Sequence, residues 1–134
     1  MNEVYPMSIK DTFNKYFNNH SETKENHWDS NLQTHYFKTT KDKAFKIVEQ
    51  FFNSSSAYDI IATSEEHGEI SVTTKNGRKA FIVTTIIMVK PFRTAVDFSV
   101  TTESVFPIDL GYSHNLIPKL YDQLKKDLVL IDNK

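Results

Sequence analysis

The stretch ISVTTKNGRKAFIVTTIIMVKPFRTAVDFSVTT, residues 70–102, decides the fold. β-Branched and aromatic residues fill three runs of this stretch, and such residues favour strands. The dipeptides Asn76-Gly77 and Pro91-Phe92 separate the runs, and both are typical of tight chain reversals. The stretch therefore predicts three antiparallel strands joined by two hairpins.

Two-residue turns at these dipeptides would set the register of the three strands. The first turn places Val72 opposite Phe81, and the second places Val96 opposite Ile87. Because side chains alternate across a strand, apolar residues of all three strands then gather on one face of the sheet. A preceding strand, joined through a turn at 66–68, adds further apolar residues to this face. We expect that face to hold Tyr58, Ile60, Ala62, Ile70, Val72, Phe81, Val83, Ile87, Val96, Phe98 and Val100.

The opposite face of the predicted sheet is our first candidate binding surface. Strand 80–89 is apolar on both sides, whereas a sheet with one wet face should alternate between apolar and polar side chains. Something should therefore cover this face: an amphipathic segment at 8–18, a second copy of the chain, or a ligand. The candidate residues are Ile82, Thr84, Ile86, Met88, Asp97 and Ser99.

A helix is predicted on the N-terminal side of the strands. Residues 32–38 have the pattern of a first strand, and 39–42 form the Ser/Thr-x-x-Asp start of a helix. Apolar residues at helical spacing follow over 44–52, and a Ser triplet at 54–56 ends the pattern. Because these apolar side chains are large, the helix should pack against the sheet.

The chain closes with a second predicted helix. Apolar residues repeat at helical spacing over 116–128. Proline is harmless only in the first turn of a helix, so Pro118 predicts a start near Asn115, with His114 or Asn115 as the cap. The order is then strand, helix, four-stranded antiparallel meander, helix, with both helices on one sheet face. This α+β order is that of the TATA-binding-protein-like, or helix-grip, folds, and it implies no function.

Residues 1–31 are predicted to lie outside this unit. Ser8 and Asp11 begin a short amphipathic helix near 8–18. Residues 18–31 are polar and lack periodicity, as expected of a tether. The expected organisation is an N-terminal amphipathic segment and tether at 1–31, followed by a single α+β domain at 32–134.

Composition excludes several classes of protein. The chain has no Cys, so it has neither disulfides nor a thiolate site, and the reducing cytoplasm is its expected location. The N-terminus lacks the basic and apolar regions of a signal peptide, and no run approaches the roughly 18 apolar residues of a membrane helix. The net charge is −1 and only two residues are Arg, so we expect no nucleic-acid or membrane partner.

The segment FPIDLGYSHN, residues 106–115, is a second candidate site. It contains the residue types of a nucleophilic triad, yet its Ser and His are adjacent and no Gly-x-Ser-x-Gly motif surrounds them. One interpretation is a corner in which Gly111 makes the turn and polar side chains cap the helix. The other is a polar pocket between the loop and the sheet, formed by Glu103, Asp109, Tyr112 and His114.

The five histidines give no pattern of a metal site. They lie at positions 20, 27, 35, 67 and 114, without a His-x-x-x-His or Glu-x-x-His pair. Glu65 and Glu66 lie beside His67, where a solvated turn is the simpler interpretation. We therefore expect no metal and no cofactor.

Two stretches carry a resemblance to known families. From Leu32 onward, and most clearly in AFIVTTIIMVKPFRTAVDFSVTTES and DLGYSHNLIPKLYDQL, the chain resembles a family of small, functionally uncharacterised cytosolic proteins from Bacillus and its relatives. More loosely, the ending from Glu103-Ser104 to Asp109-x-Gly111-x-x-x-Asn115 is similar to a bacterial domain-of-unknown-function family. Chains of that family close with a Ser-rich strand, an Asp-x-Gly-x-Asn turn and a helix. Neither resemblance implies a reaction.

These observations favour a non-enzymatic, cytosolic binding or interaction module that uses the mixed sheet face. Its expected partner is a second copy of the chain or another protein. The alternative is a small-molecule-binding protein or a hydrolase that uses the pocket at loop 103–114.

Overall fold

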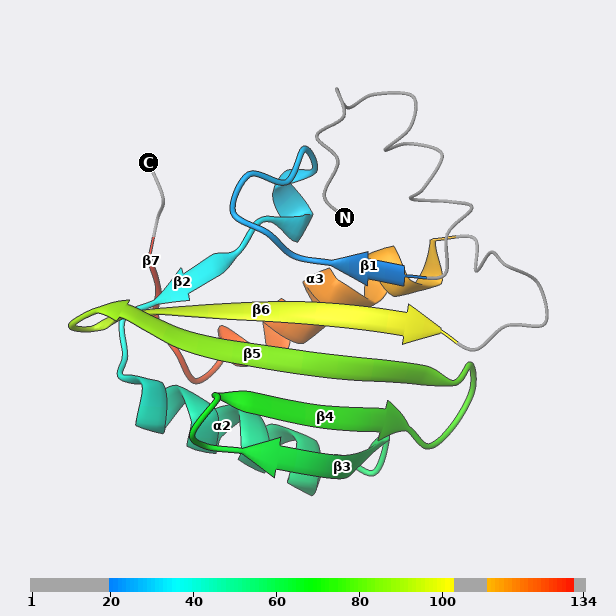
Figure 1. Cartoon of the computed structure of the whole chain (residues 1–134). Coiled ribbons are helices and arrows are strands. Elements are labelled where there is room, and N and C mark those ends of the chain that lie inside the picture. Colours follow the sequence, from blue (N-terminus) through cyan, green and yellow to red (C-terminus); the bar gives the residue numbers. More distant parts are fainter. Residues whose placement is uncertain (1–19, 103–110, 132–134) are drawn as a thin grey trace.

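The structure is a computed structural model that describes residues 20–102 and 111–131. In this part of the chain the architecture is α+β, with a seven-stranded antiparallel sheet packed against two α-helices (Figure 1). The predicted helix at 8–18 lies outside the described residues. Across the sheet the order is β3 (Tyr58–Ser64), β4 (Glu69–Thr74), β5 (Ala80–Lys90), β6 (Arg93–Thr102), β2 (His35–Phe37) and β7 (Leu130–Ile131), and β1 (His20–Glu22) also pairs with β6.

The two helices, α2 (Lys41–Ser54) and α3 (Tyr112–Leu124), cover the same face of the sheet (Figure 1). Their buried side chains join those of the strands in one apolar core. α2 begins within one residue of its predicted start: Thr40, and not Thr39 of the Ser/Thr-x-x-Asp pattern, is its N-cap, and the Thr40 hydroxyl accepts the Lys43 amide at 3.2 Å. Among the described residues, no helix is long and apolar enough to cross a membrane.

α3 starts earlier than its proline suggests. The helix begins at Tyr112 after Gly111, which adopts φ 85, so Pro118 lies in the second turn. The predicted start near Asn115 is therefore wrong by three residues. A proline at this place removes one backbone hydrogen bond. The buried stripe of α3 compensates, since tertiary packing supplies most of the stability of a protein helix.

The connection between β4 and β5 is longer than a two-residue turn. Thr73 pairs with Phe81, and residues 75–79 form the loop between the strands. Gly77 has φ 74, but Asn76 does not have the positive φ that a type I′ turn needs. Consequently Val72 lies opposite Ile82, not Phe81.

The second hairpin contains a bulge. Lys90 pairs with Arg93 as expected, but the register shifts between Met88 and Lys90, and Met88 then pairs with Thr94. A bulge adds one unpaired residue to one strand, so every partner beyond it moves by one position. Val96 therefore lies opposite Ile86 and not opposite Ile87.

Both corrections exchange the two faces of β5, whereas the residues of β4 and β6 lie on their predicted faces. Ile82 and Ile86 are 0% exposed in the core, whereas Phe81 and Ile87 are 44% and 51% exposed on the opposite face. The assignment of Phe81, Val83 and Ile87 to the helix side is wrong, and Phe81 and Phe98 lie on opposite sides of the sheet. A one-residue slip produces this result because the side-chain period of a strand is two.

The turn between β3 and β4 is shaped by glycine. Gly68 has φ 68, as predicted, and a Cβ there would lie 2.2 Å from the Ile86 carbonyl oxygen. The predicted three-residue turn at 66–68 is wrong, because Ser64 pairs with Glu69 and the turn has four residues, 65–68. In β3 the pairing is irregular between Ile60 and Ala62. Ala62 is therefore exposed, and its predicted place in the core is wrong. Tyr58 and Ile60 do pack against the core, as predicted.

β1 and β2 form an interrupted edge beside β6. β1 pairs with residues 99–101 of β6, and β2 pairs with residues 94–96. The intervening chain leaves the sheet, forms a 3-10 turn at Ser30–Leu32, and returns. The sheet thus includes His20–Glu22, a segment that the sequence pattern had assigned to the tether.

Candidate functional site

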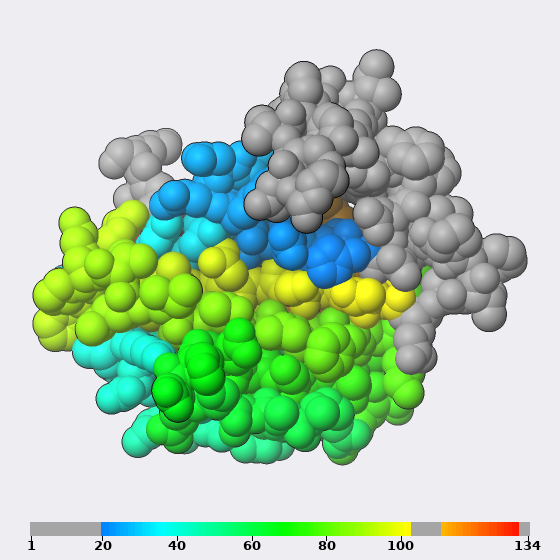
Figure 2. Space-filling model, viewed as in Figure 1, coloured from blue at the N-terminus to red at the C-terminus, as the bar shows by residue number. Residues whose placement is uncertain are grey.

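The sheet face opposite the helices, which we call the open face, is turned toward the viewer in Figure 2. β5 lies near its middle and contributes Phe81, Val83, Thr85 and Ile87. Small hydroxyl residues of β4 and β6 flank the apolar ones. Three rows cross the strands: Thr73, Phe81, Thr101 and His20; Ser71, Val83, Ser99 and Glu22; and Glu69, Thr85 and Asp97.

The structure divides the six residues predicted for the binding surface between two faces. Ile82, Thr84 and Ile86 are fully buried under the helices, so their placement on the open face is wrong. Met88 follows them in the alternation of β5 but is exposed near the end of the strand. Asp97 and Ser99 do lie on the open face. Whether any of the six binds a partner remains a prediction.

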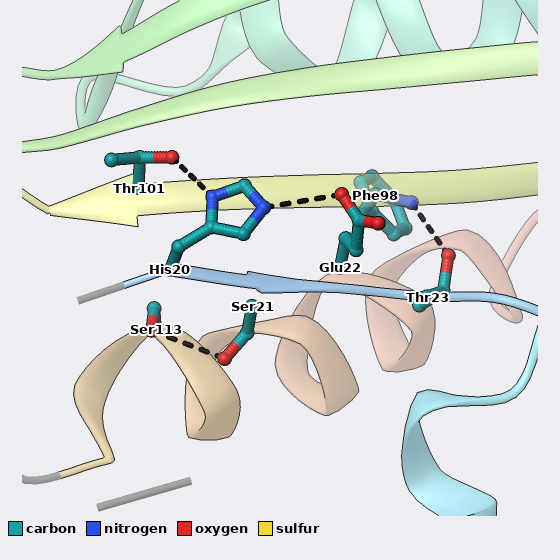
Figure 3. Close-up of polar contacts among 7 residues, drawn as sticks. All are labelled: His20, Ser21, Glu22, Thr23, Phe98, Thr101 and Ser113. Carbon is teal, nitrogen blue, oxygen red and sulfur yellow. Dashed lines mark hydrogen bonds and ion pairs between the residues drawn. The ribbon is translucent and has the colours of Figure 1, made fainter. Parts of the chain in front are cut away.

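His20 links β1 to β6 at the edge of the open face (Figure 3). Its Nδ1 lies 2.5 Å from the Thr101 hydroxyl, and its Nε2 lies 3.1 Å from a Glu22 carboxylate oxygen. The hydrogen bond with His20 lowers the pKa of Glu22, although partial burial opposes this effect. The open face therefore carries an ionised carboxylate held in a defined position.

Asp97 ties the interrupted edge to β6. One of its carboxylate oxygens accepts the hydroxyls of Thr23 at 2.5 Å and Thr34 at 2.6 Å. The Thr23 hydroxyl in turn accepts the Phe98 amide at 2.9 Å (Figure 3). Since Thr23 and Thr34 lie at the two ends of the chain excursion, Asp97 closes the excursion. A structural role thus accounts for this carboxylate, which the sequence suggested as a ligand group.

Exposed carboxylates border the apolar centre of the open face. Its three rows contain Glu22, Glu69 and Asp97 and no Lys or Arg, whereas Lys24 lies near Glu22 and Arg93 lies over the Tyr36 ring in the row of Ile87. Glu22 and Glu69 are exposed, and Phe81 lies between two threonines. Such a surface is electrostatically complementary to a cationic partner that also carries apolar groups.

The described part of the second candidate site does not form one cluster. Glu103 and Asp109 lie outside the described residues. The Tyr112 ring lies 5.1 Å from the Arg78 guanidinium carbon. His114 is buried, and its Nε2 lies 2.8 Å from an Asp29 carboxylate oxygen. Tyr112 and His114 thus contact different partners, and a pocket at loop 103–114 remains a prediction.

His114 also anchors a segment that the sequence did not connect with it. Its ring stacks at 6.5 Å from the Trp28 ring, and its neighbour Ser113 has its hydroxyl 3.2 Å from that of Ser21 (Figure 3). Both contacts join α3 to the edge segment from β1 to β2. Sequence offered no signal for them, because the partners are more than 80 positions apart.

The described residues contain no candidate metal site, and two hollows among them lie away from the open face. No three His, Asp or Glu side chains there are grouped to hold a metal ion. One hollow of about 550 Å³ lies between α2 and the end of α3, and includes Phe51 and Lys126. Another of about 140 Å³ lies at the start of α2 beside Glu65. Neither hollow includes Tyr112 or His114.

Comparisons with protein-family models, curated proteins and solved structures give no match to the chain.

Proposed function

We propose that the protein is a non-enzymatic interaction module that binds a basic, amphipathic polypeptide segment through its open face. One observation carries the proposal: Phe81 and Ile87 are exposed on β5, in the interior of the sheet. The solvated face of an antiparallel sheet normally bears polar residues at such positions. Apolar side chains of this size, rimmed by polar groups, mark interaction sites.

The shape and charge of the face support a polypeptide as the partner. Pockets for small molecules are concave and enclose most of their ligand. The described hollows lie elsewhere, and the open face offers rows of side chains on a sheet. Glu22 and Glu69 border the apolar centre, so a segment with both Lys or Arg and apolar side chains fits best.

Two further features belong to the proposal. The described order has two strands before α2, four strands between the helices and one after α3, and it contains the strand, helix, four strands and helix of a helix-grip type of fold, which by itself carries no function. The absence of Cys supports residence in the cytoplasm.

Isotope-labelled full-length protein titrated with two model peptides tests the proposal. One peptide is a Lys/Leu amphipathic sequence, and the other replaces each Lys by Glu. We expect only the basic peptide to shift the amide signals of residues 81–87 and 97–101. Phe81→Ser should weaken binding roughly tenfold, because it removes one large apolar side chain that the complex would bury.

A matched control and the contrary results define the limits of this test. Ile61→Ser removes an exposed apolar side chain from the edge strand β3 and should leave the affinity unchanged. Equal binding of the acidic peptide, or signal shifts confined to other surfaces, would contradict the proposal. Sedimentation showing a dimer that Phe81→Ser dissociates would identify a second copy as the partner instead.

A further inference from the structure

A second apolar surface lies at one end of the sheet. Nine large apolar side chains are exposed among the described residues, and six of them lie at this end. Phe92 is 60% exposed and Val129 is 66% exposed. We call the following six residues the apolar tip: Ile87, Met88, Val89, Phe92, Val129 and Leu130.

Strand pairing places the two parts of the apolar tip at the same end of the sheet, separated by the buried residues Phe37 and Thr94. Leu130 pairs with Phe37, Phe37 with Thr94, and Thr94 with Met88, so one row crosses from β7 to β5. Next to this row, the Lys38 amide donates to the Val129 carbonyl at 2.8 Å. The hairpin of β5 and β6 projects beyond its neighbouring strands, at the left of Figures 1 and 2. The hairpin part of the apolar tip therefore projects from the sheet.

Basic side chains accompany the apolar tip. Lys90 and Arg93 face each other across the hairpin turn, and Lys38 follows the row at Phe37. The Arg93 guanidinium carbon lies 4.1 Å from the centre of the Tyr36 ring. The sequence contains no Asp or Glu between Glu69 and Asp97, but the turn with Glu65 and Glu66 lies at the same end of the sheet, where the Ile86 amide donates to the Gly68 carbonyl at 2.7 Å. The nearby Glu25 carboxylate accepts the Tyr36 hydroxyl.

We propose that the apolar tip inserts into the interface of a membrane that contains anionic lipids. A projecting hairpin cannot enclose a peptide, but it can enter the boundary between headgroups and acyl chains. The backbone of the hairpin is paired across β5 and β6 except at the bulge before Lys90, while β4 pairs with β5 only as far as Thr85. Apolar insertion and attraction of Lys and Arg to anionic headgroups together give the two signals that membrane attachment needs.

This role differs from the expectation of no membrane partner, because that expectation considered only spanning segments and overall charge. A reversible surface contact needs neither a long apolar run nor a net positive protein. It needs local apolar and basic groups, which folding collects from residues 38, 87–93 and 129–130. The apolar tip shares Ile87 with the open face, whereas the proposed polypeptide site is centred on Phe81 at the other end of β5.

Co-sedimentation of the full chain with vesicles tests the inference. We expect binding to vesicles of phosphatidylcholine and phosphatidylglycerol but not to phosphatidylcholine alone, and weaker binding at high salt. Phe92→Asn should lower the partition coefficient roughly tenfold, since it removes one large apolar group. Asn tolerates the φ of 57 at this position, so the variant should fold. Lys90→Gln and Arg93→Gln should each lower the partition coefficient roughly fivefold.

Two matched variants keep the test specific. Phe81→Ser changes the open face and should leave vesicle binding unchanged, while Phe92→Asn should leave binding of the basic peptide unchanged. The two proposals can therefore fail separately. A Phe92→Trp variant that also carries Trp28→Phe should show a blue shift of its fluorescence only with anionic vesicles.

Three results would overturn the inference. The first is no binding of the unaltered chain to anionic vesicles, and the second is equal binding to neutral vesicles. The third is self-association that Phe92→Asn abolishes while vesicle binding is absent, which would assign the apolar tip to a contact between copies.

Discussion

Alternate residues of β5 meet opposite environments. Ile82 and Ile86 are enclosed by the helices, whereas Phe81 and Ile87 are about half exposed on the open face. Their apolar character does not distinguish the two pairs. On a strand that is apolar on both sides, hydrophobicity thus leaves the face undecided, and pairing with the neighbouring strands decides it.

The largest expected effect is a difference in stability between variants on the two faces of β5. Ile82→Ala should lower the free energy of unfolding by about 2–5 kcal/mol, because it leaves a cavity in the core. Phe81→Ala should change it by less than about 0.5 kcal/mol, as is usual for exposed positions. Denaturant unfolding of both variants measures the difference. A greater loss for Phe81→Ala would break the comparison and restore the register with two-residue turns.

A smaller effect concerns the two threonines at the centre of β5. The Thr84 hydroxyl is buried and has no hydrogen-bond partner among the described residues, whereas Thr85 is partly exposed on the open face. Thr84→Val should raise the free energy of unfolding by about 1 kcal/mol, because it removes an unsatisfied buried polar group of similar shape. Thr85→Val should be nearly neutral. Thermal unfolding checks both, and a destabilised Thr84→Val would reveal an unrecognised partner.

The smallest effect is a dependence on pH that distinguishes two histidines. His35 lies on the core side of β2, stacked 3.6 Å from the Tyr121 ring, and burial lowers its pKa from 6.5. The His35 imidazole therefore binds a proton more readily in the unfolded chain than in the folded protein. Stability should be full above about pH 6.5 and should decrease as the pH falls below that value.

Denaturant unfolding at pH 7.5 and pH 5.5 measures this dependence. We expect His35→Gln to reduce the loss of stability on acidification. His20→Gln, on the open face, should retain most of that loss. An unchanged pH profile in His35→Gln would show that burial of His35 is not its cause.

Local patterns predicted α2 and the faces of β4 and β6. The capping signal and the apolar spacing of α2 act within a few residues, so sequence alone located this helix to within one residue of its start at the Thr40 cap. The two hairpin registers agreed with each other but were both wrong by one residue. Each error moved β5 by one residue against a neighbour, and together they moved β6 by two residues against β4, which leaves the faces of β4 and β6 unchanged. Their agreement was therefore not independent evidence for the face of β5.

The candidate site was predicted only in part. Asp97 and Ser99 were assigned to the correct face because β6 has clear alternation. His20 and Glu22 were missed because their positions depend on pairing with a strand about 80 residues away. Phe81 and Ile87 would have been recognised if the loop at 75–79 and the bulge before Lys90 had been expected.

The sequence by itself determined the class of this protein: α+β, with strands over 70–102 and amphipathic helices on either side of the meander. Those properties follow from residue preferences and short-range periodicity. Tertiary structure alone decided which side of β5 is buried, which edge strand joins β6, and where exposed apolar groups gather. The physical reason is that each of these outcomes depends on a loop length or a long-range pairing, whose energy involves residues far apart in the chain.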